Sequence, residues 1–292
     1  IGGGPIAFGS PASYYLDPGS SDVQEYLISI IRELVTNYPI DGIQFDYIRY
    51  VQADAGYPAV SSYTSSGLKR FQRITGRSDT PTATGDTQWD DFRRRGITEI
   101  VRRARAEIPG MSSTRQPVRL SAAVVTWGNA PTDFSGSGAY ALFSNWEEWQ
   151  RLGFLDTCVP MTYYAESSYP TWYRNWVDKE MTWRYDRQMV VGQGTYLNTF
   201  SQSRTQLLYA QNAGADGLCT YSYRDTTSDS SNPWDWYPYV ATNLFTQEAA
   251  VPTMPWRSSA TATEGTLWGR VTDSTTSDPI DDASVQVGSL DP

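Results

Sequence analysis

Histidine is absent from this chain of 292 residues, and its absence excludes several kinds of catalytic site. Ser-His-Asp and Cys-His centres need an imidazole ring, and so do most zinc sites. Any proton transfer is left to carboxylates and tyrosines. We therefore expect neither a metal ion nor a cofactor, and we look for function among the acidic side chains.

Cysteines, long apolar runs and basic charge are also scarce. The two cysteines, Cys158 and Cys219, lie in apolar runs without metal-type spacing, and we expect both to be buried free thiols. No stretch reaches 18 apolar residues, so we expect no transmembrane segment. The 23 Lys and Arg against 32 Asp and Glu give a formal net charge of -9. This charge argues against nucleic acid as a partner, because phosphates require clustered basic side chains.

From residue 20 onward, helical and strand-like patterns alternate, as is typical of parallel α/β structure. Amphipathic helices are expected at residues 21–37, 89–108, 146–152, 169–183 and 201–212. Apolar strands that lead into polar or aromatic loops are expected at residues 40–47, 120–127, 155–164, 189–196 and 217–223. Residues 1–19 are too short and too rich in Gly, Pro and Ser to supply three more strands. We therefore expect strands four to eight of a (β/α)8 TIM barrel that is incomplete at its N-terminus.

The composition changes after Leu244, which divides the chain into three parts. Residues 1–246 form the expected partial barrel, and residues 247–264 indicate a linker because they are rich in Pro, Ser and Thr. Residues 265–292 alternate like a hairpin around a polar turn and are too short for an independent sheet. Their GRV and ASVQV runs resemble the first strands of the carboxypeptidase-regulatory-like β-sandwich, so we expect a truncated sandwich there.

The acidic residue best placed for chemistry is Asp46, in the run DGIQFDYIRY. Side chains alternate along a strand, so Gln44 and Asp46 face one side while their apolar neighbours face the other. Outward positions of a barrel strand meet helices, so the polar pair must point inward, and active sites lie at the carboxyl ends of such strands. We interpret Asp46 as catalytic; the alternative is a structural ion pair with Arg49.

Rings and amides recur where the expected strands end. Aromatic residues make up 14% of the chain, with 11 Trp and 20 Tyr. Flat rings stack on pyranose faces, while amides and phenols bond sugar hydroxyls. Each ring taken singly is more typical of core packing, but five strands that end alike indicate a sugar cleft. The substrate-binding candidates are Gln44, Arg49, Trp127, Met161, Tyr163, Gln193, Tyr196, Tyr221 and Tyr223.

Hydrolysis of a glycosidic bond usually takes two carboxylates, one that protonates the leaving oxygen and one that acts as nucleophile or as base. Besides Asp46, the acids near the expected rim are Glu166, Asp133 and Asp225. Glu166 directly follows the sixth strand of the expected barrel, so we select it as the second catalytic residue. The alternative is an ordinary solvated acid in a loop.

The run DGIQFDYIRY, with LDPGSSDVQEYL before it and FQRITG, LSAAVVTWG, PMTYY and VVGQGTYLN after it, resembles the family-10-like glycosylhydrolases. The likeness covers about residues 10–257 in one consistent order. It implies a barrel that acts on a bacterial carbohydrate polymer, such as peptidoglycan or an amino-sugar exopolysaccharide, in the cell envelope or as a secreted protein. It also assigns the family's acid at the fourth strand to Asp46. Many members have a second Asp directly after that acid, where this chain has Tyr47.

The chitinase-type barrels offer a competing likeness through their DGxDxDxE and Met-x-Tyr patterns. The matching residues are Asp41, Gly42, Asp46, Met161 and Tyr163. However, Gln44 replaces the middle Asp of that pattern, and Ile48 replaces the proton-donating Glu. These replacements argue against the substrate-assisted chemistry of the chitinase-type barrels.

Three functions agree with these residues. The first, which we favour, is a glycoside hydrolase that cleaves O-glycosidic bonds with Asp46 and Glu166. The second is a barrel that binds carbohydrate without cleaving it, because the adjacent acid is missing at Tyr47. The third is a scaffold module that holds appended domains at the cell surface.

Overall fold

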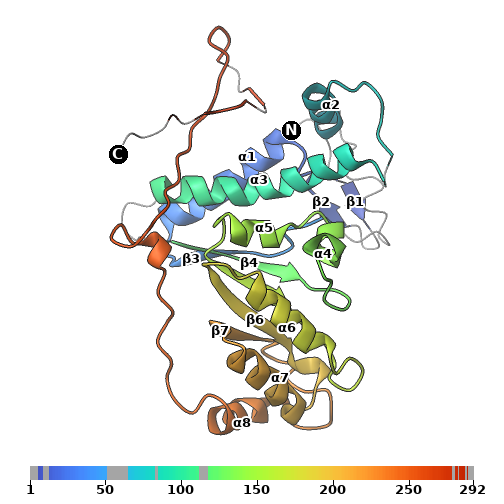
Figure 1. Ribbon diagram of the computed structural model, residues 1–292, viewed down its shortest axis with the longest axis vertical. Coiled ribbons are helices and arrows are strands. Elements are labelled where there is room, and N and C mark those ends of the chain that lie inside the picture. Colours follow the sequence, from blue (N-terminus) through green and yellow to red (C-terminus); the bar gives the residue numbers. More distant parts are fainter. Residues whose placement is uncertain are drawn as a thin grey trace.

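The computed structural model contains one curved sheet of five parallel strands that alternate with helices (Figure 1). It describes residues 6–8, 13–50, 65–82, 85–111, 118–277, 280–281, 283–286 and 288. The strands lie side by side in chain order and are β3 (Gly42–Phe45), β4 (Arg119–Val125), β5 (Thr157–Met161), β6 (Gln188–Gly194) and β7 (Gly217–Tyr221). This order, with every pair parallel, confirms the predicted α/β class and agrees with a partial (β/α) barrel.

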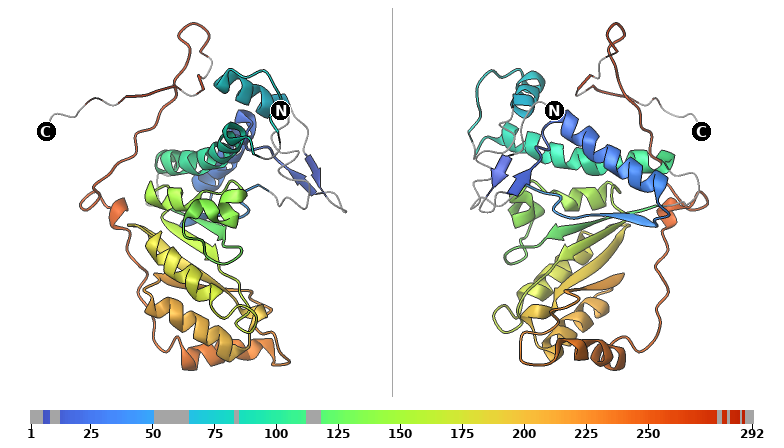
Figure 2. Two further views of the ribbon diagram at one scale, coloured as in Figure 1. Left: turned by 45° about the vertical axis from the view of Figure 1, so that its right-hand side comes forward. Right: turned by 180° about the vertical axis from the view of Figure 1, so that it is seen from behind.

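The helices cover one face of this sheet (Figures 1 and 2). The longer ones are α1 (Ser21–Asn37), α3 (Thr87–Met111), α6 (Trp172–Thr182) and α7 (Phe200–Asn212). The shorter ones are α2 (Ser65–Thr75), α4 (Gly138–Ala141), α5 (Trp146–Arg151) and α8 (Trp236–Asn243). A small hairpin of β1 (Ile6–Phe8) and β2 (Ser13–Tyr15) precedes them. The predicted helices are therefore present, whereas α2, α4 and α8 come in addition to them.

The main core lies between the sheet and the helices. Leu120 and Ala122 of β4 face it, because alternate residues of a strand point to the same side. Trp146 and Trp149 of α5 and Trp176 of α6 are fully buried in it. Much of the aromatic content is thus core packing, as expected of large apolar rings.

No helix among the described residues covers the other face of the sheet, which we call the open face (Figures 1 and 2). On β3, Gln44 is exposed there, whereas Ile43 and Phe45 pack against the core, which confirms the predicted alternation. Both cysteines are free thiols; Cys158 is buried on the helix side, but Cys219 is exposed. The prediction that Cys219 is buried is wrong, because alternate positions of β7 face the open side and nothing in the described chain covers them.

After α8, the chain runs back along the amino ends of the strands (Figures 1 and 2). There Gln188 Nε2 at the start of β6 donates to the carbonyls of Pro252 and Thr253, at 3.2 and 2.9 Å. The short 3₁₀ turn η5 (Pro255–Arg257) follows, and the tail then runs towards the end of the molecule where α2 lies. These contacts hold the tail at the end of the sheet opposite to Asp46.

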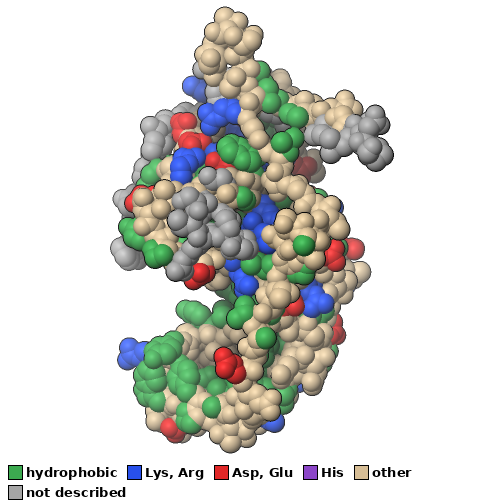
Figure 3. Space-filling view, turned by 90° about the vertical axis from the view of Figure 1, so that its left-hand side faces the viewer, with side chains coloured by type: hydrophobic (Ala, Val, Ile, Leu, Met, Phe, Trp, Pro, Cys, Tyr) green, Lys and Arg blue, Asp and Glu red, His purple; other side chains and the backbone are tan. Residues whose placement is uncertain are grey.

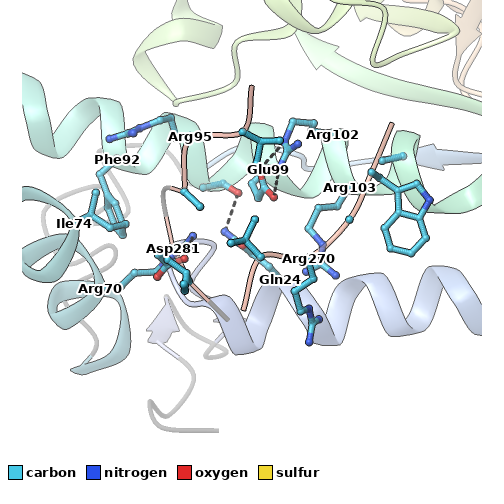
Figure 4. Close-up of a pocket in the computed structure, with 18 of the residues that line it drawn as sticks. Gln24, Arg70, Ile74, Phe92, Arg95, Glu99, Arg102, Arg103, Arg270 and Asp281 are labelled. Atoms are coloured by element: carbon cyan, nitrogen blue, oxygen red, sulfur yellow. Dashed lines mark hydrogen bonds and ion pairs between the residues drawn. The ribbon is translucent and has the colours of Figure 1, made fainter. Parts of the chain in front are cut away.

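The last part of the tail docks against α2 and α3 (Figure 4). Asp281 forms ion pairs with Arg70, at 3.2 Å, and with Arg73. Within this part of the chain, Ile280 N donates to Val271 O at 2.9 Å. The described residues beyond position 264 add no strand to a sheet, so the β-sandwich stays a prediction.

Candidate functional site

Asp46 lies at the carboxyl end of β3, directly after the last strand residue, and is exposed. Its Oδ1 accepts a hydrogen bond of 2.8 Å from the backbone N–H of Tyr47. Tyr47 has a φ of 52°, which is the left-handed region that non-glycine residues rarely adopt. Backbone conformations of this kind occur preferentially at active sites, where they aim a side chain. The backbone is therefore strained at Tyr47, the residue that follows Asp46.

Arg49 approaches two aromatic rings and forms no ion pair with Asp46. Its Cζ lies 4.4 Å from the ring centre of Tyr47 and 5.3 Å from that of Trp127. Burial lowers the pKa of Arg49, while the neighbouring Tyr47 and Asp46 oppose this effect. Because the two side chains do not form a salt bridge, the structural alternative for Asp46 loses its expected partner.

Three tyrosines form a platform on the open face. The rings of Tyr163 and Tyr221 are stacked, with centres 5.4 Å apart, and Tyr196 meets them edge-on at 6.4 and 6.0 Å. Gly192 and Gly194 of β6 make room for the platform, since a Cβ at Gly194 would lie 3.0 Å from the Tyr163 Cβ. The VVGQGTY run thus has glycines where the Tyr163 ring crosses the strand.

Electrostatics connect this platform with Asp46. Burial raises the pKa of Tyr163, and the neighbouring Cys219, Tyr221, Tyr196 and Asp46 raise it further. Asp46 makes the smallest of these contributions to the pKa of Tyr163. A carboxylate and a tyrosine platform share one open face at the carboxyl ends of the strands.

The remaining predicted residues of the open side lie around this centre. Gln44 Oε1 accepts a hydrogen bond of 3.2 Å from Ser121 Oγ of the next strand. Trp127 and Tyr223 are exposed at the ends of β4 and β7, and Met161 is half-buried at the end of β5. These residues extend the site along the rim on both sides.

Gln193 faces the helices instead of the open side. Its side chain is fully buried, and its Nε2 donates to Ser203 Oγ at 3.3 Å and to Gln206 Oε1 at 3.0 Å, both on α7. The alternation along β6 explains this position, since its glycine neighbours occupy the open face. Gln193 therefore holds α7 against β6.

Glu166 is tied to the helix layer. Its Oε1 pairs with Arg174 of α6 at 2.6 Å, and its Oε2 accepts from Gln206 of α7 at 3.0 Å. Its backbone N–H donates to Asn198 Oδ1 at 2.7 Å. All these partners lie on α6, on α7 or just before α7, so these contacts fasten the loop after β5 to the helices.

Sequence reasoning missed an exposed aromatic cluster beside Tyr223. Trp234 and Tyr237 lie 5.6 and 5.7 Å from the Tyr223 ring, measured between ring centres. The run NPWDWYPY could have indicated this cluster, because its aromatic residues follow the last strand as the other rim residues do. Tyr47 was missed as well, although its ring adjoins Asp46.

Two further findings concern metal binding and membrane spans in the described part of the chain. It contains no group of three or more His, Cys, Asp or Glu side chains placed to hold a metal ion. None of its helices combines the length and apolar character needed to cross a membrane.

The chain is similar to one protein family and to named glycosyl hydrolases. The sequence profile of a family described as Glycosyl hydrolase-like 10 matches residues 6–195. Glycosyl hydrolase YngK of Bacillus subtilis is 24% identical over 277 residues, which cover 86% of this chain and 49% of YngK. Glycosyl hydrolase DigH of Escherichia coli K12 is 27% identical over 164 residues, which cover 53% of this chain and 33% of DigH. The match thus spans half or less of these relatives, and the chain belongs to the Glycosyl hydrolase-like 10 family.

Proposed function

We propose that this chain provides the catalytic acid of a glycoside hydrolase that cleaves O-glycosidic bonds of a bacterial envelope glycan or exopolysaccharide. The carrying observation is the exposed Asp46 carboxylate at the carboxyl end of β3, beside the platform of Tyr163, Tyr196 and Tyr221. Family membership and the names of two relatives support the reaction class. A peptidoglycan-type or amino-sugar polymer is the proposed substrate, and the cell envelope or the exterior is the proposed location.

In this proposal the platform binds one sugar ring and Asp46 acts on the adjoining bond. Pyranose C–H faces stack on tyrosine rings, while phenol groups donate to sugar hydroxyls. Such contacts fix the glycosidic oxygen relative to the carboxylate, and positioning of this kind contributes strongly to rate. Asp46 then serves as proton donor, nucleophile or base, the three roles open to a carboxylate in this reaction.

Glu166 remains the proposed second carboxylate, although its contacts restrict it. To reach a substrate, its side chain would have to exchange Arg174 and Gln206 for the glycan. Asp133 and Asp225 are exposed in neighbouring rim loops and are the two replacements for this role. Each of them follows a strand of the sheet, as catalytic groups of barrels do.

The test is Asp46→Asn, which keeps the shape of the side chain and removes its charge. We expect release of reducing ends from peptidoglycan strands or amino-sugar polymers to fall by at least about 100-fold, the usual size of a general acid-base contribution. Asp22→Asn, an exposed acid in the first turn of α1, is the control and should keep full activity. Undiminished hydrolysis by Asp46→Asn would refute the assignment.

A carbohydrate-binding barrel without turnover is the second candidate function. Two observations favour it: Tyr47 occupies the position of the second acid, and Glu166 is held by Arg174. Calorimetry combined with product analysis separates the two candidates. Saturable heat from a glycan that is recovered intact indicates binding alone, whereas shortened chains indicate hydrolysis.

A further inference from the structure

A cavity of about 700 Å³ lies at the amino ends of the strands, away from Asp46. The loop after α5, the helix α3 and tail residues 255–267 form its walls. Its charged lining is strongly unbalanced in sign. Four arginines face two acids there, namely Arg102, Arg105, Arg151 and Arg187 against Asp186 and Glu264.

The buried acid beside this cavity, Asp156, has no capacity for another donor. It is fully buried and receives hydrogen bonds from Arg105, from Trp256, from two nitrogens of Arg257 and from the backbone N–H of Leu120. These five bonds measure 2.7 to 2.9 Å. A carboxylate offers about four lone-pair positions. Asp156 is therefore saturated.

Arg187 consequently lacks an adequate counter-ion in the described chain. Its side chain is 10% exposed, and its nearest carboxylate, Glu264, lies 3.9 Å away with a side chain that is 78% exposed. An exposed partner at this distance contributes little, because water screens the pair. The Nε of Arg187 is buried without a hydrogen-bond partner. The Arg187 guanidinium lies over Trp256, with 4.9 Å from Cζ to the ring centre, and its Nη1 donates a long hydrogen bond of 3.4 Å to the Asp186 carbonyl.

Neighbouring features agree with an excess of positive charge. Burial lowers the pKa of Arg105, and the adjacent Arg257 and Arg187 add to this effect while Asp156 opposes it. Gly153 has a φ of 67°, and a Cβ there would overlap the Arg187 guanidinium. Lys and Arg side chains gather beside the tail on this side of the molecule (Figure 3). Arg105 and Arg257 share the single charge of Asp156, and Arg187 beside them pairs only with the exposed Glu264, so the arginines have weak compensation for their positive charge.

We propose that this cavity is a binding site for a phosphate-class oxyanion, with Arg187 as its principal ligand. A guanidinium fork matches a tetrahedral oxyanion with two parallel hydrogen bonds, and a dianion supplies the missing charge. The source is either free phosphate or the phosphate group of a small molecule such as a sugar phosphate. Because tail and barrel both line the cavity, the bound anion would join them. This inference goes beyond the hydrolase function and does not depend on it.

The experiment measures the thermal unfolding midpoint of the 292-residue chain at pH 8 in inorganic phosphate, sulfate, glucose 6-phosphate or glucose. Sodium chloride keeps the ionic strength constant, so that only specific binding raises the midpoint. We expect a saturable rise with phosphate, because a ligand that binds only the folded state stabilises it. Glucose should have no effect. A tighter response to glucose 6-phosphate than to phosphate identifies a phosphate-bearing molecule, and the reverse identifies the free ion.

Two substitutions should act in opposite directions on the phosphate midpoint concentration. Arg187→Gln should weaken binding at least about tenfold, because charge-assisted bonds are lost. Glu264→Gln should tighten it by up to about fivefold, because a competing carboxylate is removed. Arg224→Gln, an exposed arginine after β7, is the control and should change nothing. The proposal is overturned if phosphate and chloride give equal midpoints at equal ionic strength, or if Arg187→Gln leaves phosphate binding unchanged.

Discussion

Glu180 is a carboxyl group that the fold has removed from water entirely. It lies on α6 and is fully buried, with one hydrogen bond of 2.6 Å from Thr162 Oγ1. Its other oxygen, Oε2, is buried without a hydrogen-bond partner in the described chain. Burial raises the pKa of Glu180 from 4.5 to about 8, and the bond from Thr162 only partly opposes this. Glu180 is therefore protonated in the folded protein at neutral pH.

This shift predicts a stability that falls as pH rises. Between pH 4.5 and about 8 the folded state holds a proton that the unfolded state has released, so increasing pH favours unfolding. The free energy of unfolding should fall by up to about 1.4 kcal/mol per pH unit in this window and level off above it. Because the chain has no histidine, few other groups titrate there. Urea unfolding at pH 5, 6.5 and 8.5 measures the slope.

Glu180→Gln isolates the cause, because glutamine has the same shape and never ionises. We expect this variant to lose most of the pH slope and to be more stable than the parent chain at pH 8.5. Glu33→Gln, which changes an exposed acid on α1, should keep the parent slope. An unchanged slope in Glu180→Gln would show that another group titrates.

Single residues also show how far the sequence determines the site. The position of Asp46 on the open side follows from alternation along β3, and the structure places it there. The same alternation puts Gln193 on the helix side. The sequence suggested a substrate-binding position instead, because Gln193 lies between two glycines near the carboxyl end of its strand. The partners of Glu166 come from two helices distant in sequence, and no local pattern encodes such contacts.

At the scale of elements, the tail is fastened to the sheet through one buried acid. Asp156, just before β5, pairs with Arg257 of the tail at 2.7 Å and with Arg105 of α3 at 2.8 Å. Burial opposes the charged form, but the bonds and charges of Arg257 and Arg105 outweigh it and lower the pKa of Asp156. A strand start, a helix and the tail thus depend on one carboxylate.

Asp156→Asn should therefore destabilise the protein strongly. Removing one partner of a buried pair leaves the other charge uncompensated, which costs about 3–5 kcal/mol. The control is Asp91→Asn, because Asp91 pairs with Arg94 at 2.5 Å but is 62% exposed. Its loss should cost at most about 1 kcal/mol. Urea unfolding of both variants at pH 7 measures the two costs, and equal values would contradict a special role for Asp156.

Helices and strands were predictable where their own residues show a regular apolar periodicity. The helix at residues 21–37 has the predicted bounds, because its sequence is a long amphipathic run. Its apolar residues do not reveal which side is covered, however. Ile28 and Ile31 are buried, whereas Tyr26, Ile30 and Leu34 are exposed although they are equally apolar. The neighbours of a helix decide this, and periodicity does not identify them.

At the scale of the whole molecule, the contacts that attach the tail include two of different physical character. The buried attachment joins Arg257 and Asp156, whose side chains are 9% and 0% exposed. The outer attachment joins Asp281 to Arg70 and to Arg73, whose side chain is 67% exposed. Salt shortens the range of charge interactions from about 10 Å at 0.1 M to about 3 Å at 1 M, and it acts mainly on accessible charges.

Raising the salt concentration from 0.1 to 1 M should therefore release the outer attachment and leave the buried one. Hydrogen exchange measures both attachments. The Ile280 amide, which donates to Val271 O, reports on the outer attachment, and the Arg257 amide, which donates to Met254 O, reports on the buried one. We expect exchange at Ile280 to accelerate while exchange at Arg257 stays slow. Asp281→Asn should reproduce the fast exchange at low salt, because it removes the carboxylate that both arginines share. Simultaneous acceleration at both amides would instead show that the tail detaches as one unit, with Asp156 unable to hold it independently.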